Sequence, residues 1–303
     1  MRFRGGYGTI VGMRAEVEHA LAALKSGNVE DGLRLLESTV LAFGMKVCGH
    51  REDAEDTAQE VLLKLLPYIS KFDSPQAFSV WLYTVARNRC LMSRRKSKFA
   101  PKEHLALDEL MPSGEELAAL ATSPHSTPEN AVLRKENAEH VRAALNHVPP
   151  QYRLVLVLHD MEALNTSEVA KITGLREGTV RVRLHRARLA LRKELAKREH
   201  RSSYRKGRKP AEAKPRRCRQ IFAALSDYLD QTLDPTMCDE LEKHMEGCTP
   251  CEAFLADLEQ TVERCRAFDP QSKSKQQSKM REKVLLEYRR VLSSIQKTSA
   301  SSS

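Results

Sequence analysis

Four residues in the C-terminal third of this 303-residue chain have the types and the spacing of metal ligands. Two residues separate Cys248 from Cys251, and His244 precedes Cys248 by one helical turn. Cys218 lies further upstream, with 25 residues between it and His244. Thiolate sulfur and imidazole nitrogen are the usual ligand atoms of tetrahedral zinc sites. The pattern therefore predicts a Zn²⁺ site, structural or regulatory, formed by Cys218, His244, Cys248 and Cys251.

A zinc ion held by four protein ligands has no open position for water or substrate, and a catalytic zinc requires one. The chain also lacks an H-E-x-x-H sequence, so we expect no enzyme activity. Cys238 and Cys265 are more typical of small core residues than of ligands, and Cys48 and Cys90 stand alone. This grouping of seven cysteines indicates a reducing compartment with a metal site, not a disulfide scaffold.

Residues 165–188 carry a second pattern, NTSEVAKITGLREGTVRVRLHRAR, whose spacing is that of a helix-turn-helix. Ser167 can cap a short helix, Gly174 supplies a tight turn, and a second helix starts near Glu177. The expected buried stripe of the second helix consists of Val180, Leu184, Ala187 and Leu191.

The opposite face of that second helix is cationic, with short side chains near its start. The side chains expected to project from it are Thr179, Val182, His185, Arg186 and Arg188. Such a helix suits the major groove of DNA, where its first turns meet base edges and its arginines meet phosphates. The alternative is an ordinary helical hairpin with a solvated arginine face.

Acidic side chains gather on one face of a helix expected from residue 51 onward. Its core face is formed by Ala54, Ala58, Val61, Leu62, Leu65 and Ile69, which leaves Asp53, Asp56, Gln59 and Glu60 outside. Acidic residues in a first helical turn also suit the helix dipole, so a stabilising cap is the alternative interpretation.

The next helix carries the chain's only tryptophan, Trp81, followed by Asn88 and the cationic run Arg94, Arg95 and Lys96. An aromatic ring, an amide and arginines together offer stacking, base-edge recognition and charge to single-stranded DNA. The competing interpretation places the aromatic residues in the core, and we expect it to hold for Phe78 and Leu82.

The charge of the chain is uneven. The whole carries 50 Lys and Arg against 40 Asp and Glu, a formal charge of +10. Residues 171–217 contain 18 basic and 4 acidic residues, whereas residues 218–270 contain 4 basic and 12 acidic ones. A cationic segment of this density indicates a polyanion partner, and the acidic module that follows it is able to attract it. A solvated charged face is the alternative.

Apolar residues recur three and four positions apart throughout, so we expect an all-α protein. The expected divisions are an N-terminal extension (1–25), a helical domain (26–98), a linker (99–128), a second helical domain (129–200), a basic linker (201–217), a zinc-binding domain (218–268) and a tail with a short basic helix (269–303). Apolar runs are far shorter than the roughly 20 residues of a membrane span, and no leader pattern is evident. We expect a cytoplasmic protein.

Three segments resemble regions 2 and 4 of the extracytoplasmic-function sigma factors of the bacterial sigma-70 family: DAEDTAQEVLLKL, FSVWLYTVARN and SEVAKITGLREGTVRVRLHRARLAL, the last preceded by HVPPQYRLVLVLHDMEAL. The resemblance covers about residues 30 to 200. It implies a subunit that binds core RNA polymerase and directs it to promoter DNA. One departure is Met92, because the family often has Asp at that place.

The resemblance also assigns roles to individual residues. The residues implied to face core polymerase are Asp53, Asp56, Gln59 and Glu60. Those implied to capture the minus-10 element are Trp81, Arg87, Asn88, Arg94, Arg95 and Lys96. Those implied to meet the minus-35 element are Arg176, Thr179, Arg181, Val182, Arg183, His185, Arg186 and Arg188.

The C-terminal block resembles the zinc-containing anti-sigma domain. The resemblance rests on the Cys and His spacing, on CRQIFAALSDYLDQTLDP and on the closing helix with Phe254, Leu255, Leu258 and Val262. In that family the module masks the sigma factor, and in some members oxidation of the ligand thiols releases zinc and the sigma factor. This implies a sigma factor regulated in cis, although a zinc that only staples a small domain stays open. The alternative function is a helix-turn-helix regulator without sigma activity.

Overall fold

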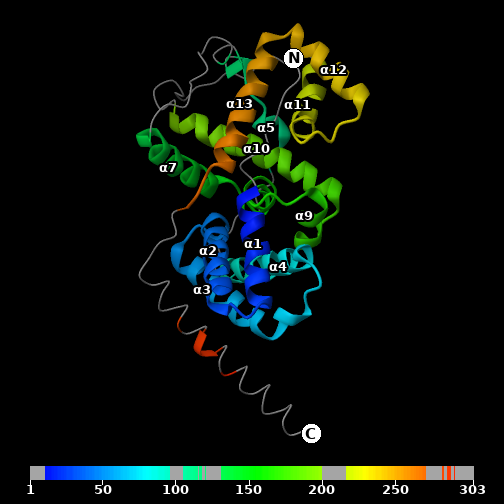
Figure 1. The fold of residues 1–303 in the computed structure, drawn as a ribbon. Coiled ribbons are helices and arrows are strands. Elements are labelled where there is room, and N and C mark those ends of the chain that lie inside the picture. Colours follow the sequence, from blue (N-terminus) through cyan, green and yellow to red (C-terminus); the bar gives the residue numbers. More distant parts are fainter. Residues whose placement is uncertain are drawn as a thin grey trace. The chain divides into compact units, whose positions relative to one another are not determined.

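The computed structural model describes residues 11–95, 105–114, 116–117, 120, 131–199, 216–270, 282, 285–287 and 290. Every regular element in these ranges is helical, as the periodicity predicted (Figure 1). The chain forms two compact units. The described residues of the N-terminal unit fall within 7–100, 162–174 and 269–303, and those of the C-terminal unit fall within 101–161 and 175–268.

The N-terminal unit is built around helix α2, which packs against α1, α3 and α4. Its elements are α1 (Val11–Lys25), α2 (Val29–Cys48), α3 (Arg51–Leu65), the short 3₁₀ helix η2 (Leu66–Lys71), α4 (Pro75–Arg95) and α9 (Thr166–Thr173). A Cβ added to Gly44 would lie 2.9 Å from the Cα of Ala54, so α2 and α3 can approach this closely only because position 44 is glycine.

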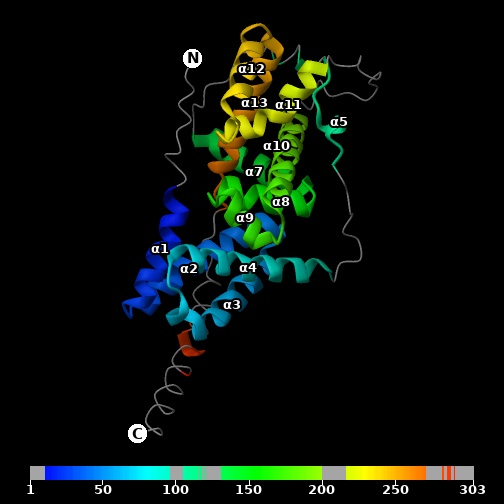
Figure 2. The same ribbon diagram turned by 90° about the vertical axis from the view of Figure 1, so that its right-hand side faces the viewer.

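The C-terminal unit is built around α10, which packs against α7, α8, α11 and α13. Its elements are α5 (Leu107–Leu110), α7 (Ala131–His147), α8 (Pro150–Leu156), the π-helical turn η3 (Val157–Met161), α10 (Glu177–Glu199), α11 (Arg216–Leu229), α12 (Pro235–Glu246) and α13 (Thr249–Arg266). Figure 2 shows α11, α12 and α13 gathered at one end of this unit, next to α10.

The helix-turn-helix segment has the predicted elements with a different cap. Helix α9 starts from a capping box in which the side chain of Asn165, not Ser167, accepts a hydrogen bond from the backbone of Glu168 at 2.9 Å. The Glu168 carboxylate accepts one from the Asn165 backbone in return. Gly174 ends α9 with φ of 70°, a left-handed conformation that favours glycine, and α10 begins at Glu177 as predicted.

The expected core faces are confirmed with one exception. The stripes Ala54, Ala58, Val61, Leu62, Leu65 and Val180, Leu184, Ala187, Leu191 are all buried, as are Phe78 and Leu82. Ile69 is only half-buried, because the chain has already passed into η2 at that point. In the predicted zinc-binding domain 218–268, which we call the C-terminal module, Phe254, Leu255, Leu258 and Val262 are buried. Phe254 packs edge to face against Phe222, with ring centroids 4.8 Å apart.

The segments expected to be extensions or linkers contain structure of their own. Residues 11–25 form α1, whose residues Val17, Ala20, Leu21 and Leu24 are buried. Within the expected linker 99–128, α5 buries Leu110, and Lys193 of α10 donates a hydrogen bond to the carbonyl of Glu109 at 2.6 Å. Most of the short basic helix expected in the tail lies outside the described residues. Among the helices that the structure describes, none has the length and apolarity needed to span a bilayer.

Two cysteines that we expected to stand alone are joined. Cys48, the last residue of α2, forms a disulfide with Cys90 of α4. The two residues are 42 positions apart, and sequence spacing gives no indication of their pairing. The expectation that Cys48 and Cys90 stand alone is therefore wrong.

Candidate nucleic-acid interface and metal centre

Helix α10, the predicted recognition helix, is exposed over its first half. Arg176, in the turn before the helix, is exposed, and so are Thr179, Arg181 and Val182. Val182 leaves 51% of its surface accessible, which is unusual for a large apolar side chain. An exposed apolar group among short polar ones suits contact with base edges and thymine methyl groups in the major groove.

The part of α10 from Arg183 to Arg192 is covered; we call residues 177–182 the first half of the helix and the longer stretch 183–192 its second half. Arg183 and Arg186 are half-buried, but His185 and Arg188 are buried, so the expectation that these last two project to solvent is wrong. Arg192, one turn further on, is also buried. The three buried side chains lie at positions i, i+3 and i+7, which places them on one face of the helix.

Arg188 is held by two carboxylates from different parts of the C-terminal unit. Its guanidinium donates to Asp160 of η3 at 2.6 and 2.8 Å, and to Asp230, just after α11, at 2.7 and 2.9 Å. Both pairs are bidentate, the geometry in which arginine also binds phosphate. Burial alone would raise the pKa of Asp160, but Arg188 beside it holds that pKa well below its usual range. This arginine is therefore unavailable to DNA in the described arrangement.

His185 faces α11 through Ser226. The ring Nδ1 of His185 lies 2.9 Å from the Ser226 hydroxyl oxygen. Burial, followed by the nearby charges of Arg188 and Arg186, lowers the pKa of His185 to about 4. The imidazole is consequently neutral near pH 7, because burial and the two neighbouring guanidinium charges oppose its protonation.

Arg192 extends the covered face to α13. Its Nε donates to Asp257 at 2.5 Å, and its guanidinium carbon lies 4.4 Å from the centre of the Phe254 ring. Two acidic side chains of the C-terminal module, Asp230 and Asp257, thus neutralise two arginines of α10. The sequence signal for this contact was the acidic segment that follows the basic one.

The predicted minus-10 side chains lie on α4. Trp81 is half-buried and packs against Phe72, with ring centroids 5.4 Å apart, and against the exposed Tyr68. Asn88 is exposed, whereas Arg87 donates to the carbonyl of Ile172 in α9 at 3.1 Å. Partial burial lowers the pKa of Arg87. The side chains of Arg94 and Arg95 and all of Lys96 lie outside the described residues.

The predicted polymerase-facing side chains lie along α3. Asp56 is exposed, and Asp53, Gln59 and Glu60 are half-buried. Arg89 of α4, a residue that the sequence analysis did not single out, forms an ion pair with Glu60 at 2.8 Å and lies 3.7 Å from Asp56. This ion pair links the predicted polymerase face to the predicted minus-10 helix.

Three of the four predicted metal ligands come together. One ligand atom from each of His244, Cys248 and Cys251 lies within 4.8 Å of the other two, and His244 Nε2 is 3.4 Å from Cys251 Sγ. Gly247 caps the end of α12 and Cys248 caps the start of α13, so the turn between the helices presents the thiols beside the imidazole. One nitrogen and two soft sulfurs at this separation fit zinc. The side chain of Cys218, in α11, lies outside what the structure describes.

Comparison with known families matches all three parts of the chain. The family model described as Sigma-70 region 2 matches residues 33–99, and the one described as Sigma-70, region 4 matches residues 138–191. The model described as Putative zinc-finger matches residues 218–251. Residues 33–99 and 138–191 are therefore similar to two regions of the sigma-70 family, in the same order.

Relatives that match this chain include extracytoplasmic-function (ECF) sigma factors. The ECF RNA polymerase sigma factor SigW of Bacillus subtilis is 28% identical over 186 residues, which cover 60% of this chain and 98% of that relative. SigE of Mycolicibacterium smegmatis is 30% identical over 52% of this chain and 58% of its own length. The sigma-E factor of Escherichia coli is 28% identical over 46% of this chain and 72% of its own.

Proposed function

We propose that this chain is an ECF sigma factor that directs RNA polymerase to promoters from within the cytoplasm, and that α11–α13 mask its recognition helix in cis. The function is transcription initiation, not catalysis. The two sigma-70 matches, in the order region 2 then region 4, support the first part. The face of α10 formed by His185, Arg188 and Arg192 supports the second, because residues of α11, of the turn after α11 and of α13 cover it.

The single observation that carries the masking proposal is the second carboxylate on Arg188. Asp160 of η3 lies within the region 4 match and already neutralises this arginine, whereas Asp230 belongs to the zinc-finger match. A carboxylate that binds a guanidinium bidentately occupies the place that a DNA phosphate would take. Binding of the module and binding of a phosphate at Arg188 are therefore mutually exclusive.

In this proposal, zinc would stabilise the module that masks α10. When bound, the ion would crosslink the start of α13 to the end of α12, and through Cys218 to α11. His244, Cys248 and Cys251 would hold it, together with Cys218 as the predicted fourth ligand. The module of about 50 residues is too small to build a large core, so its hold on α10 depends on that crosslink.

The test is promoter-directed transcription with core polymerase, comparing the full chain with the double variant Asp230→Asn, Asp257→Asn. Loss of both carboxylates removes the charge pairing with Arg188 and Arg192 and leaves the zinc ligands untouched, so transcription from the variant should rise about tenfold or more. Asp239→Asn, Glu240→Gln is the matched control, because it also removes two carboxylate charges, both from exposed positions of α12. Equal output from all three proteins would contradict masking.

A truncation that ends near Lys209 provides the second arm. The Bacillus subtilis relative is matched over 98% of its length by 186 residues of this chain, which supports a working unit that lacks α11–α13. If the truncated chain and the full chain both fail to direct transcription, the sigma assignment itself is contradicted. The helix-turn-helix regulator then becomes the better explanation, and it predicts that the isolated chain binds duplex operator DNA without polymerase.

A further inference from the structure

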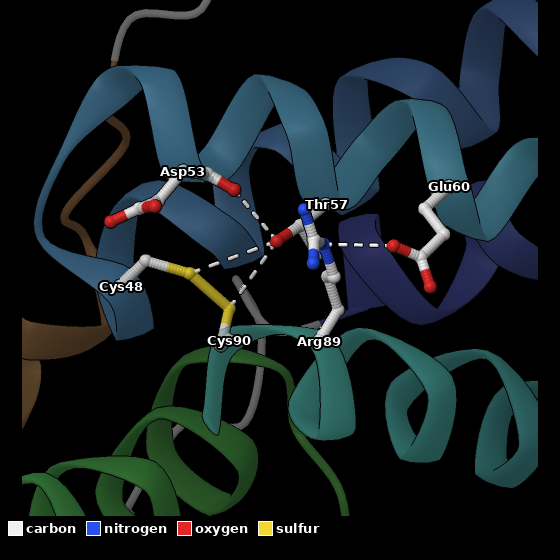
Figure 3. The surroundings of a disulfide bond; sticks show 6 residues. All are labelled: Cys48, Asp53, Thr57, Glu60, Arg89 and Cys90. Atoms are coloured by element: carbon white, nitrogen blue, oxygen red, sulfur yellow. Dashed lines mark hydrogen bonds and ion pairs between the residues drawn. A yellow bond between two sulfur atoms is a disulfide. The ribbon is translucent and has the colours of Figure 1, made fainter. Parts of the chain in front are cut away.

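The disulfide between Cys48 and Cys90 lies in the interior of the N-terminal unit. Each residue exposes 1% of its surface, and the Cα atoms are 5.5 Å apart. Figure 3 shows the bond joining the end of α2 to the C-terminal half of α4, with α3 above it. The predicted zinc thiols belong to the other compact unit, so this pair is a separate thiol site.

The disulfide also touches α3. The Thr57 hydroxyl oxygen lies 3.9 Å from the Cys48 sulfur and 3.7 Å from the Cys90 sulfur, and that hydroxyl donates to the Asp53 carbonyl at 2.7 Å. Arg89, next to Cys90, reaches across to Glu60 of α3 (Figure 3). A shift of Cys90 would therefore displace the predicted minus-10 helix α4. Through Thr57 and Glu60 it would also disturb the predicted polymerase face of α3.

The same two helices hold the segment Glu162–Gly174 of the N-terminal unit. The Glu162 carboxylate accepts from Lys46 Nζ of α2 at 3.0 Å and from the Tyr83 hydroxyl of α4 at 2.7 Å. All three side chains are buried, or nearly so. Burial and the Glu162 charge raise the pKa of Tyr83 well above its usual value, so the phenol remains a donor. We call Lys46, Tyr83 and Glu162 the clasp.

The clasp depends on the spacing of α2 and α4, which the disulfide fixes. Lys46 precedes Cys48 by two residues, and Tyr83 precedes Cys90 by two helical turns. A buried ion pair that loses its geometry becomes unfavourable, because the charges remain desolvated without a partner. Arg87, between Tyr83 and Cys90, adds the bond to the carbonyl of Ile172 in α9.

We propose that Cys48 and Cys90 form a reversible dithiol–disulfide couple that sets how firmly α2 and α4 hold Glu162–Gly174 through the clasp. In the disulfide state the clasp is tight and α9 covers Arg87. In the dithiol state the two sulfurs separate, and a closely packed interior accommodates this only if α4 shifts against α2. The shift loosens the clasp and frees the side chains of α4 for DNA.

The chemistry is a two-electron oxidation by a peroxide. One thiol attacks the peroxide oxygen to give a sulfenic acid and one water, and the second thiol displaces hydroxide from that sulfur, releasing the second water as the S–S bond forms. Two thiols and one hydrogen peroxide thus give one disulfide and two waters. A small dithiol reductant reverses the step by exchange. Because both sulfurs are buried, each direction requires local opening of the helices and is slow.

The experiment uses the full-length zinc-loaded protein in two redox states, so the main comparison requires no variant. Protein treated with hydrogen peroxide and protein treated with dithiothreitol are alkylated and digested, and the Cys48–Cys90 peptide is measured by mass spectrometry. We expect the cross-linked peptide after peroxide and two alkylated peptides after reduction. Absence of the cross-link would overturn the proposal.

Hydrogen exchange then tests the conformational consequence. We expect the amides of α9 and of the clasp to exchange faster in the reduced protein, and the N-terminal unit to melt about 10 °C lower, because the disulfide closes a long loop. The variant Cys48→Ala, Cys90→Ala should behave like reduced protein in either treatment, and Cys238→Ala, a half-buried thiol of α12, should respond like the parent. Equal exchange at α9 in both states would overturn the proposed redox control of α9. The disulfide would then only stabilise the packing of α2 and α4.

The proposal rests on the sigma function for its final readout alone. Oxidised protein should bind a single-stranded minus-10 oligonucleotide more weakly than reduced protein, with equal binding in the two states of the alanine variant. If neither state directs transcription, the proposed function fails while the mass and exchange results stand. If transcription proceeds but binding and exchange ignore the redox state, the couple fails and the sigma function stands.

Discussion

The two halves of α10 have similar sequences and opposite surroundings. Both are rich in arginine, yet Arg181 in the first half is exposed whereas Arg188 in the second is fully buried. The difference arises from what lies opposite: Arg188 meets Asp160 and Asp230 in buried bidentate pairs, and Arg181 forms an exposed ion pair with its helical neighbour Glu177 at 3.9 Å. A cationic helix therefore acquires distinct covered and open halves from the placement of a few carboxylates.

Removal of zinc should have the largest effect, because it should abolish the difference in exposure between the two halves of α10. Chelation would release His244, Cys248 and Cys251, and a module of this size without its metal is expected to unfold. Both halves of α10 would then be open. We expect hydrogen exchange in the second half of α10 to rise to the rate of the first half, and promoter binding to increase. Unchanged protection at residues 185–192 after chelation would contradict a zinc-dependent cover.

Substitution of Arg188 should have the next largest effect. Arg188→Ala leaves the buried carboxylate of Asp160 without its guanidinium, and loss of one partner of a buried pair costs about 3–5 kcal/mol of unfolding free energy. Arg181→Ala, on the exposed half, should change stability by no more than about 0.5 kcal/mol. Denaturant melts of both variants measure the contrast, and similar midpoints would show that Arg188 is not a structural pair.

Acid should weaken the contact of α11 and α13 with the second half of α10, which we call the cover, through protonation of His185. Its pKa is lowered to about 4 in the covered state, against the usual value near 6.5, so its contribution is full above pH 6.5 and falls as the pH drops toward 4. At pH 5.5 the cover should lose about 1.4 kcal/mol, a tenfold change in its equilibrium. Hydrogen exchange of α11 at pH 7.5 and 5.5, corrected for intrinsic rates, measures this.

The variant His185→Gln provides the control for that pH dependence. Glutamine retains a polar group toward Ser226 but does not titrate, so the difference between the two pH values should shrink. An unchanged difference would assign the pH effect to other groups near the contact, such as Asp227 and Asp230 on the facing side.

The smallest effect concerns the open half. Val182→Ala should leave stability within about 0.5 kcal/mol of the parent, because the side chain is exposed. It should weaken binding to a minus-35 duplex by about 1 kcal/mol in the Asp230→Asn, Asp257→Asn background, through the loss of apolar contact with a base. Weakening that is equal on all duplex sequences would indicate a backbone contact instead of base reading.

Local pattern was sufficient for most of the fold. The stripe Val180, Leu184, Ala187 and Leu191 was predicted from the period of the helix, and all four side chains are buried. The cap of α9 was assigned to Ser167 instead of Asn165, because both residue types cap helices and only the backbone geometry selects between them. Residues 11–25 looked like an extension because their apolar positions have meaning only against the surface of α2.

Pairs distant in sequence could not be predicted. Arg188 is 28 residues from Asp160 and 42 from Asp230, and no local rule links them. Lys46 and Glu162 are 116 residues apart, and Cys48 and Cys90 are 42 apart. The attraction between the basic segment 171–217 and the acidic segment 218–270 could be predicted from their charges. Counting charges does not show which residues pair.

The sequence by itself determined the helices, the helix-turn-helix, the cysteine and histidine spacing and the similarity to sigma-70 regions 2 and 4, because each depends on short-range periodicity or on residue types in a row. The tertiary structure decided which arginines of α10 are covered, which cysteines pair and which lysine meets Glu162. Those outcomes depend on where the helices lie after packing. In the buried interior a charged group interacts strongly and must have a partner, whereas in water it would be solvated without one.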